Sequence, residues 1–176
     1  MRKQKGFSLI ELLIVIAIIL IIAAIAIPNL LRARIAANEA SSVSSIRTIN
    51  TAEATYVTGY PTTGYSATLA ALGPGGVGSV CPAGGPVVGN ACLIDSNLSN
   101  ATAVANAKSG YIYNMGATAV AGINVQYAVG SSAASFNITG VRGFCSQEDA
   151  VIRFTATLNG APITTNAACA AYTLLQ

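Results

Sequence analysis

The chain has 176 residues, of which 53% are hydrophobic, and its mean hydropathy is +0.59. This composition predicts one membrane segment followed by one modest domain. The formal net charge is +3, but three of the nine basic residues precede position 6, and the other six balance six acids. Binding of nucleic acid through a basic face therefore has little support.

A short basic start, residues 1–6, leads into an apolar segment that covers residues 7–31. Only Ser8, Glu11, Pro28 and Asn29 interrupt it. The segment meets the length of roughly 20 residues that a helix needs to cross a bilayer. The basic start fits the positive-inside rule, which predicts a cytoplasmic N-terminus and an exported C-terminal part.

A cleaved secretory signal is the alternative interpretation of this segment. Such a signal has an apolar stretch of about 7–15 residues and then a small-residue cleavage site. Residues 23–26 (Ala-Ala-Ile-Ala) could imitate that site, but the apolar run is longer and no clearly polar sequence follows it. We therefore favour a membrane span.

Glu11 is the residue of this span that most needs an explanation. A carboxylate at the centre of a membrane helix costs ~2.5–3.5 kcal/mol on insertion scales. A partner of opposite charge is therefore expected. The nearest candidate is the amino group that cleavage between Gly6 and Phe7 would create.

The helix is expected to continue past Pro28 and to end at Gly59 and Pro61. An apolar stripe recurs at steps of three and four residues: Ile35, Val43, Ile46, Ile49, Tyr56 and Val57. The charged residues fall at other positions: Arg32, Arg34, Glu39, Arg47 and Glu53. A helix over residues 7–57 would be about 75 Å long, so its second half must pack on something other than lipid. Pro28 predicts a kink, because a mid-helix proline costs ~3 kcal/mol unless the helix bends or opens.

From Tyr60 onward, Gly, Thr, Ser, Ala and Pro dominate the composition, which indicates a globular head with many loops. A short helix or turn is expected at residues 65–72, and a second short helix at 95–108 with Asp95 or Ser96 as its cap. Strands are expected at residues 110–115, 123–129, 135–139, 150–158 and 170–174. An antiparallel sheet with the long helix laid against it accounts for both halves, so the predicted fold class is α+β.

Four cysteines lie beyond the span, on the side that would be exported: Cys81, Cys92, Cys145 and Cys169. An even count in an oxidising compartment predicts two disulfides, for which three connectivities are possible. We favour Cys81–Cys92 with Cys145–Cys169, because this pairing closes the shortest loops. Zinc is the alternative, but the chain has no His and no Cys-x-x-Cys pair. No metal and no cofactor are expected.

The sequence offers no catalytic constellation. It contains no His, no Gly-x-Ser-x-Gly and no Ser-x-x-Lys, and the side chains of Glu148 and Asp149 would diverge in a strand. Oxidised cysteines without a neighbouring base are poor nucleophiles. We therefore expect that the protein is not an enzyme.

The segment from Gly6-Phe7-Ser8-Leu9-Ile10-Glu11 to Ala17, together with Ala24-Ile25-Ala26-Ile27-Pro28, resembles the N-terminal signature of type IV prepilins and type II secretion pseudopilins. The match is dense over residues 6–38, and this combination of residues is highly specific. Parts of the remainder, notably Gly140-Val-Arg-Gly-Phe-Cys145, look like heads of pilin-like proteins. Many relatives carry a glycine midway between Glu11 and Pro28. None is present here, so any local unwinding depends on Pro28 alone.

The resemblance implies a processing and assembly mechanism. A membrane-embedded prepilin peptidase would cut after Gly6, which suits a cut because it has no side chain, and would N-methylate Phe7. Glu11 would then lie one helical turn from the new terminus and face the Phe7 amine of a neighbouring subunit. This pairing neutralises a carboxylate in a low-dielectric core and selects axial register. Pro28 matches the family's helix-breaking proline, around which helices open during assembly.

The resemblance also implies the pilin fold, with a leader at residues 1–6, a long helix at 7–58 and a β-sheet head at 59–176. Residues 7–31 would serve first as the transmembrane segment and then as the filament core. The expected function is that of a structural subunit of a type IV pilus, used for adhesion, motility or DNA uptake. Its implied partners are other copies of the chain, the prepilin peptidase, the inner-membrane pilus assembly platform and, before assembly, the lipid bilayer. The implied location is the bacterial inner membrane with a periplasmic head, and afterwards the extracellular pilus.

Two alternatives remain open. A type II secretion pseudopilin is favoured slightly by Tyr60-Pro-Thr-Thr, but major pseudopilins often carry a calcium loop with several acids near the C-terminus, and the last 25 residues here contain none. A plain membrane-anchored binding domain is the other alternative. Such a protein would keep residues 1–6.

Overall fold

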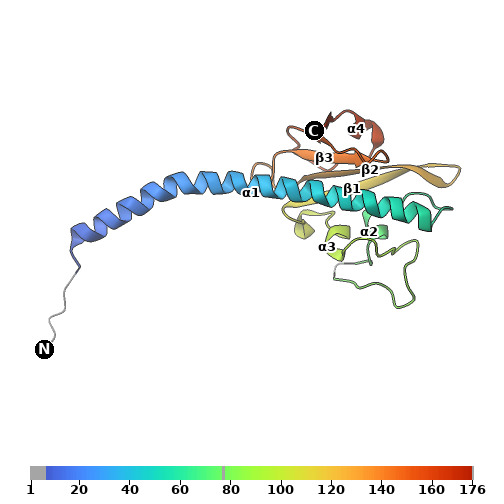
Figure 1. Cartoon of the computed structure of the whole chain (residues 1–176), viewed down its shortest axis with the longest axis horizontal. Coiled ribbons are helices and arrows are strands. Elements are labelled where there is room, and N and C mark those ends of the chain that lie inside the picture. The colour runs from blue at the N-terminus through green and yellow to red at the C-terminus, as the bar shows by residue number, and fades with distance from the viewer. Residues whose placement is uncertain (1–6, 77, 176) are drawn as a thin grey trace. The chain divides into compact units, whose positions relative to one another are not determined.

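The computed structural model describes residues 7–76 and 78–175. Contacts divide the chain into two compact units, one that ends at Arg34 and one that begins at Ile35. A single helix, α1 (Leu9–Gly59), contributes residues to both units (Figure 1). It ends at Gly59, shortly before Pro61, as the sequence predicts.

The described part of the first unit is helical from Leu9 to Arg34. Leu and Ala are good helix formers, and a helix satisfies every interior backbone N–H and C=O within the segment itself, as an apolar surrounding requires. Pro28 lies inside α1, and helical residues continue on both sides of it.

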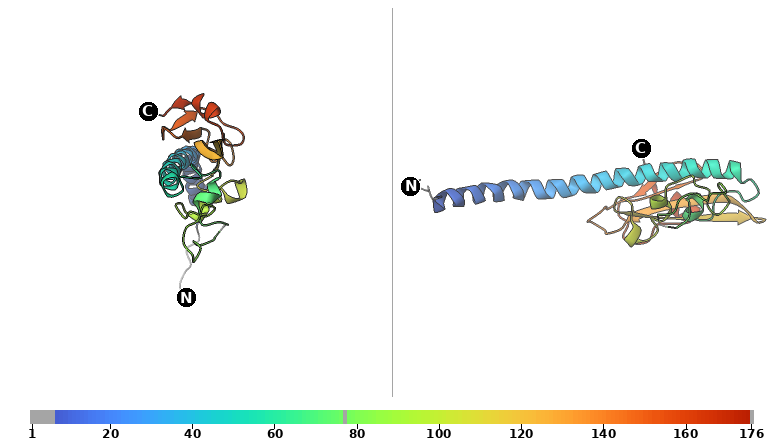
Figure 2. Two further views of the ribbon diagram at one scale, coloured as in Figure 1. Left: turned by 90° about the vertical axis from the view of Figure 1, so that its right-hand side faces the viewer. Right: turned by 90° about the horizontal axis from the view of Figure 1, so that it is seen from below.

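The second unit contains a five-stranded antiparallel sheet in which each strand pairs with its neighbours in the sequence. Its strands are β1 (Tyr111–Val120), β2 (Ile123–Ala133), β3 (Gly143–Gln147), β4 (Arg153–Thr155) and β5 (Thr173–Leu174). Residues 35–59 of α1 lie along this sheet (Figure 2). The α+β class, with a long helix on an antiparallel sheet, is confirmed.

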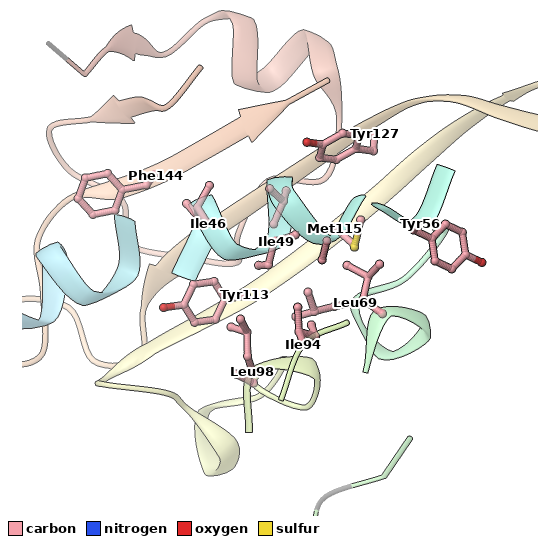
Figure 3. Close-up of a cluster of buried hydrophobic side chains, with 14 of the residues drawn as sticks. Ile46, Ile49, Tyr56, Leu69, Ile94, Leu98, Tyr113, Met115, Tyr127 and Phe144 are labelled. Atoms are coloured by element: carbon pink, nitrogen blue, oxygen red, sulfur yellow. The ribbon is translucent and has the colours of Figure 1, made fainter. Parts of the chain in front are cut away.

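The core of the second unit lies between α1 and the sheet, and short helices close it from the other side (Figure 3). Ile46 and Ile49 of α1 are fully buried beside Tyr113 and Met115 of β1. Leu69, from a short helix, is buried in the same cluster. Each large apolar side chain buried in this way stabilises the fold by ~1.5–3 kcal/mol, so the apolar stripe of α1 is what attaches the helix to the head.

Among the described residues, four short helices lie in the loops: α2 (Leu69–Leu72), α3 (Ser96–Ser99), the 3-10 helix η1 (Val104–Asn106) and α4 (Asn166–Ala170). Asp95 caps α3 through its carboxylate, which accepts from the N–H of Leu98 at 2.7 Å. The predicted helix at 95–108 is wrong in its extent, because the chain leaves helical geometry at Asn100. The carbonyl of Ala101 instead accepts from the N–H of Tyr113 at 2.7 Å. This bond to β1 draws the segment into the head.

The predicted strand at 135–139 is also wrong, and β3 takes the place expected for it. The Thr139 hydroxyl donates to the carbonyl of Ser135 and accepts from its N–H, both at 3.1 Å, and Asn137 has a φ of 62°. Ser, Thr and Asn side chains favour such local bonds over a strand ladder. The segment therefore closes into a turn, and Phe144 and Cys145 of β3 enter the core instead.

The other strand limits shift for local reasons. β1 and β2 extend further than expected and form a long hairpin, whose turn residues Ala121 and Gly122 have φ values of 51° and 85°. The strand expected at 150–158 shrinks to β4, because Ala150 has a φ of 56° in a turn. The strand expected at 170–174 shrinks to β5, because α4 occupies the residues before it.

Two disulfides staple the head, and they join the cysteines in sequential order. Cys81 pairs with Cys92 across a separation of 11 residues, and Cys145 of β3 pairs with Cys169 of α4 across a separation of 24. Constraining loops of this length lowers the conformational entropy of the unfolded chain. Each bridge typically stabilises the fold by ~2–4 kcal/mol in this way.

Candidate functional site

The candidate functional segment begins at the N-terminal end of α1. The N–H of Ser8 donates to Oε2 of Glu11 at 2.9 Å, and the N–H of Leu12 donates to the carbonyl of Ser8 at 3.3 Å. This is the reach-back half of a capping box, in which a carboxylate at the third helical position satisfies an N–H in front of the helix. The pattern Ser-x-x-Glu, rather than the charge of Glu11 alone, is the sequence signal for this contact.

The predicted processing positions lie at the edge of the described structure. Gly6 is outside the described residues, and Phe7, the first described residue, is 80% exposed. Glu11 is exposed as well. Cleavage after Gly6, methylation of Phe7, charge pairing by Glu11 and a kink at Pro28 all stay predictions.

The apolar surface of α1 between these residues and Arg32 is uncovered in the isolated chain. An 18-residue window of this helix has a mean hydropathy of 3.3, and none of the window is buried. Leu12, Ile16, Leu20 and Ile27 are each more than two-fifths exposed. Apolar surface of this size calls for lipid or protein to cover it, and the length and composition suffice to cross a bilayer.

In the second unit, Glu39 of α1 forms an ion pair with Arg142 of the head and three hydrogen bonds to the same segment. Its Oε1 accepts from the N–H groups of Val141 and Arg142, both at 3.1 Å, and its Oε2 accepts from Nε of Arg142 at 2.7 Å. Burial alone would raise the pKa of Glu39, but the Arg142 hydrogen bonds, the Val141 N–H and the guanidinium charge together hold the pKa below its ordinary value. Glu39 is therefore an ionised clamp that fixes α1 to the segment before β3.

Glu53 makes a different kind of contact further along α1. Its side chain is fully buried and accepts hydrogen bonds from the N–H of Ser66, at 2.9 Å, and from the Ser66 hydroxyl. The ion pairs found in the described residues leave Glu53 without a cation. Burial raises the pKa of Glu53 to about 7, against the lowering effect of the two Ser66 bonds. This carboxyl group is thus protonated much more readily than an ordinary glutamate.

Shorter polar side chains complete a polar seam between α1 and the head, formed by Asn38, Glu39, Ser42, Asn50 and Glu53. Asn38 donates to the carbonyl of Thr139 at 2.8 Å, and the Ser42 hydroxyl lies 2.7 Å from that of Ser131 in β2. Asn50 donates to the Ser146 hydroxyl at 2.9 Å and accepts from the Tyr127 hydroxyl at 3.0 Å. Directional bonds of this kind fix the register of the helix on the sheet, which apolar contacts alone leave loose.

The position of Glu39 and Glu53 corrects the expectation that charged residues of α1 fall outside its packed surface. Both are buried, whereas Arg32, Arg34 and Arg47 are exposed as expected. Their partners, Arg142 and Ser66, are not neighbours on the helix, and no local pattern pairs them. Spacing along the helix alone therefore could not reveal their burial.

The described residues contain a cavity but no candidate metal-binding group. Across residues 7–76 and 78–175, no group of three His, Cys, Asp or Glu side chains could hold a metal ion. A cavity of about 350 Å³ between α3 and η1 is lined by small and polar residues, among them Asn97, Asn100 and Asn106. Lys108 also lines it and is paired with Asp95 at 3.0 Å.

Comparison with known proteins gives matches in the N-terminal segment. Residues 1–27 match the family described as the prokaryotic N-terminal methylation motif. The chain is also 72% identical over 39 residues to the protein "Type IV wide pilus major component PilA4" of Thermus thermophilus. This similarity covers 22% of the chain and 30% of that protein. No solved structure gives a significant match.

Proposed function

We propose that this chain is a pilin subunit, a structural protein that polymerises into a type IV pilus. The carrying observation is the N-terminal match to the methylation motif, together with the 72% identity to a type IV pilus component over 39 residues. The uncovered apolar surface of α1 supports the proposal, because a chain that stayed in water would leave it exposed. Lipid would cover this surface before assembly, and other copies of the chain would cover it afterwards.

The proposed maturation begins with the leader at residues 1–6, which prepilin peptidase removes by cutting after Gly6. The same enzyme N-methylates Phe7. Residues 7–31 hold the subunit in the inner membrane with the head, residues 59–176, in the periplasm. The assembly platform then moves the subunit into the growing filament, whose core the same residues form.

Glu11 has a specific part in this proposal. Before assembly its carboxylate accepts from its own Ser8 N–H. In the filament it would exchange this weak partner for the Phe7 amine of a neighbouring subunit, and the ion pair would be neutral overall. A subunit that slipped along the axis would bury Glu11 alone, at a cost of several kcal/mol. The pairing therefore favours one register, and Pro28 supplies the point at which the helix opens.

The decisive experiment is N-terminal analysis of the mature protein by mass spectrometry. We expect a chain that begins at an N-methylated Phe7, and an intact Met1 would contradict the proposal. The Gly6→Val variant should remain uncut in the membrane, since a side chain at this position blocks the close approach of the peptidase. The Glu11→Leu variant should still be cut but should give fewer filaments. Wild-type filament yield from Glu11→Leu would show that the charge pairing is dispensable.

A pseudopilin of a type II secretion system is the second candidate, because Tyr60-Pro-Thr-Thr follows α1. Purified surface filaments distinguish the two. If the chain is their main subunit, the pilus assignment stands, and its roles in adhesion, motility or DNA uptake can then be tested with a deletion strain. If the chain is found only with secretion machinery, the pseudopilin assignment replaces it.

A further inference from the structure

Two basic residues, Arg32 and Arg34, follow the apolar part of α1 directly. Both side chains are exposed. In the part of the chain that the structure describes, the ion pairs join other residues: Lys108 with Asp95, Arg142 with Glu39 and Arg153 with Asp149. Glu39 is the nearest acid along the helix, and Arg142 already occupies it. The two guanidinium groups thus have unused charge and hydrogen-bond donors.

The length of the apolar segment predicts the depth at which these arginines lie in a bilayer. Residues 12–31 extend about 30 Å at ~1.5 Å per residue, which equals the hydrocarbon thickness of about 30 Å. With Glu11 at one boundary, Arg32 and Arg34 lie at the headgroups of the other leaflet. Residues two apart on a helix point roughly 200° from each other. The two side chains therefore reach headgroups on opposite sides of the helix.

We propose that Arg32 and Arg34 form a collar that binds the anionic phospholipid headgroups of the leaflet facing away from the leader. The proposal rests on the membrane-held subunit described under the proposed function. A guanidinium group matches the phosphate geometry with two parallel hydrogen bonds, and long basic side chains at helix ends extend to this level. A net negative charge on the lipid strengthens its binding about fivefold for each arginine, the equivalent of ~1 kcal/mol.

Removal of the leader changes which end of the span carries the basic residues. Before cleavage, Arg2, Lys3 and Lys5 flank the inner end. After cleavage, the Phe7 amine and Glu11 cancel at that end, and the collar carries the remaining positive charge beside the span. Cleavage thus transfers the electrostatic attachment from the inner leaflet to the outer one. A subunit attached in this way is released toward the periplasm when the collar exchanges lipid for protein.

The test uses the mature chain, which begins at Phe7 and so lacks the basic residues Arg2, Lys3 and Lys5, in vesicles of phosphatidylcholine and phosphatidylglycerol at equal amounts. The protein is extracted in mild detergent and affinity-purified, and the retained lipids are counted by mass spectrometry. We expect the wild type to retain phosphatidylglycerol over phosphatidylcholine by roughly 25-fold, from about fivefold for each of the two arginines. The R32Q/R34Q variant should fall to a ratio near one. The matched control is R47Q, which removes an exposed arginine of the same helix about 20 Å further along, and it should keep the wild-type ratio.

The outcomes separate this proposal from the one on which it rests. Equal retention of both lipids by the wild type, or an unchanged preference in R32Q/R34Q, overturns the collar while the pilin assignment stands. An equal loss in R47Q also overturns it, because the preference would then follow total charge. A chain that fails to enter the vesicle fraction contradicts the membrane span itself. Arg32 and Arg34 are exposed, so the double variant should keep both disulfides and the wild-type melting temperature.

Discussion

Replacing the buried Glu53 with glutamine should remove most of the pH dependence of stability between pH 5 and 8. Burial raises the pKa of Glu53 from 4.5 to about 7, so the folded chain binds this proton more tightly than the unfolded chain. Stability is therefore highest below the unfolded value and falls as the pH rises toward the folded one. A pKa difference of about 2.5, at ~1.4 kcal/mol for each pH unit, corresponds to a loss of ~3 kcal/mol by pH 8.

The side chains around Glu53 should not change their own charge between pH 5 and pH 8. The chain contains no His. Tyr56 and Tyr127, which share the charge environment of Glu53, have pKa values raised by burial and by Glu53 itself, so neither ionises in this range. The amide of the Glu53→Gln variant can accept from the Ser66 N–H and donate to the Ser66 hydroxyl, so it imitates the protonated carboxyl group.

The assay is thermal unfolding of the full chain in mild detergent at pH 5, 6, 7 and 8, followed by the near-ultraviolet circular dichroism of its tyrosines. About 2.5 kcal/mol of this falls between pH 5 and pH 8, which should lower the melting temperature of the wild type by about 5–10 °C over that range. The Glu53→Gln variant should vary by much less and should be the more stable protein at pH 8. Equal pH slopes in the two proteins would refute the assignment of this titration to Glu53.

Further predictions concern the Glu39 clamp and one glycine. Glu39→Ala leaves the Val141 and Arg142 N–H groups and a half-exposed guanidinium without their acceptor, and it should lower stability at pH 7 by about 3 kcal/mol. Because the pKa of Glu39 is lowered, this loss should shrink below pH 4.5, and an equal loss at all pH values would count against the clamp. Gly64→Ala should destabilise by more than about 2 kcal/mol in the same melts, because its φ is +77° and a Cβ would collide with the backbone carbonyl of Asn124. Gly122→Ala, with a φ of +85° but open space, should cost only about 1 kcal/mol, and equal losses would show that the collision is relieved.

Local chemistry explains which parts of the fold were predictable. The apolar run, the position of Glu11 within it and the end of α1 at Gly59 depend on neighbours a few residues away, and hydropathy and helix-stop signals report those directly. The antiparallel class follows in the same way from short β-rich segments between turns.

The errors arise where individual side-chain hydrogen bonds, local or distant, decide the outcome. Ser135 and Thr139 flank a segment that contains Phe136 and Ile138 and so imitates a strand, yet the hydroxyl of Thr139 closes a turn. Glu39 and Arg142 are separated by 103 positions, and no helical periodicity reports that the carboxylate of Glu39 is buried. A local side-chain bond overrides the strand pattern at the first place, and a tertiary contact overrides the helical pattern at the second.

The spread of the polar seam along α1 also bears on how the head withstands mechanical load. Its members, from Asn38 to Glu53, cover about 22 Å of helix at ~1.5 Å per residue. A pull along the helix axis loads these bonds at the same time, in shear, instead of opening them one after another as a zipper does. Bonds that share a load must break together, so α1 resists sliding out of its head far better than it resists being peeled sideways. Among the seam contacts, the Asn38 hydrogen bond and the ionised Glu39 clamp lie nearest the end of the helix at which such a pull would arrive.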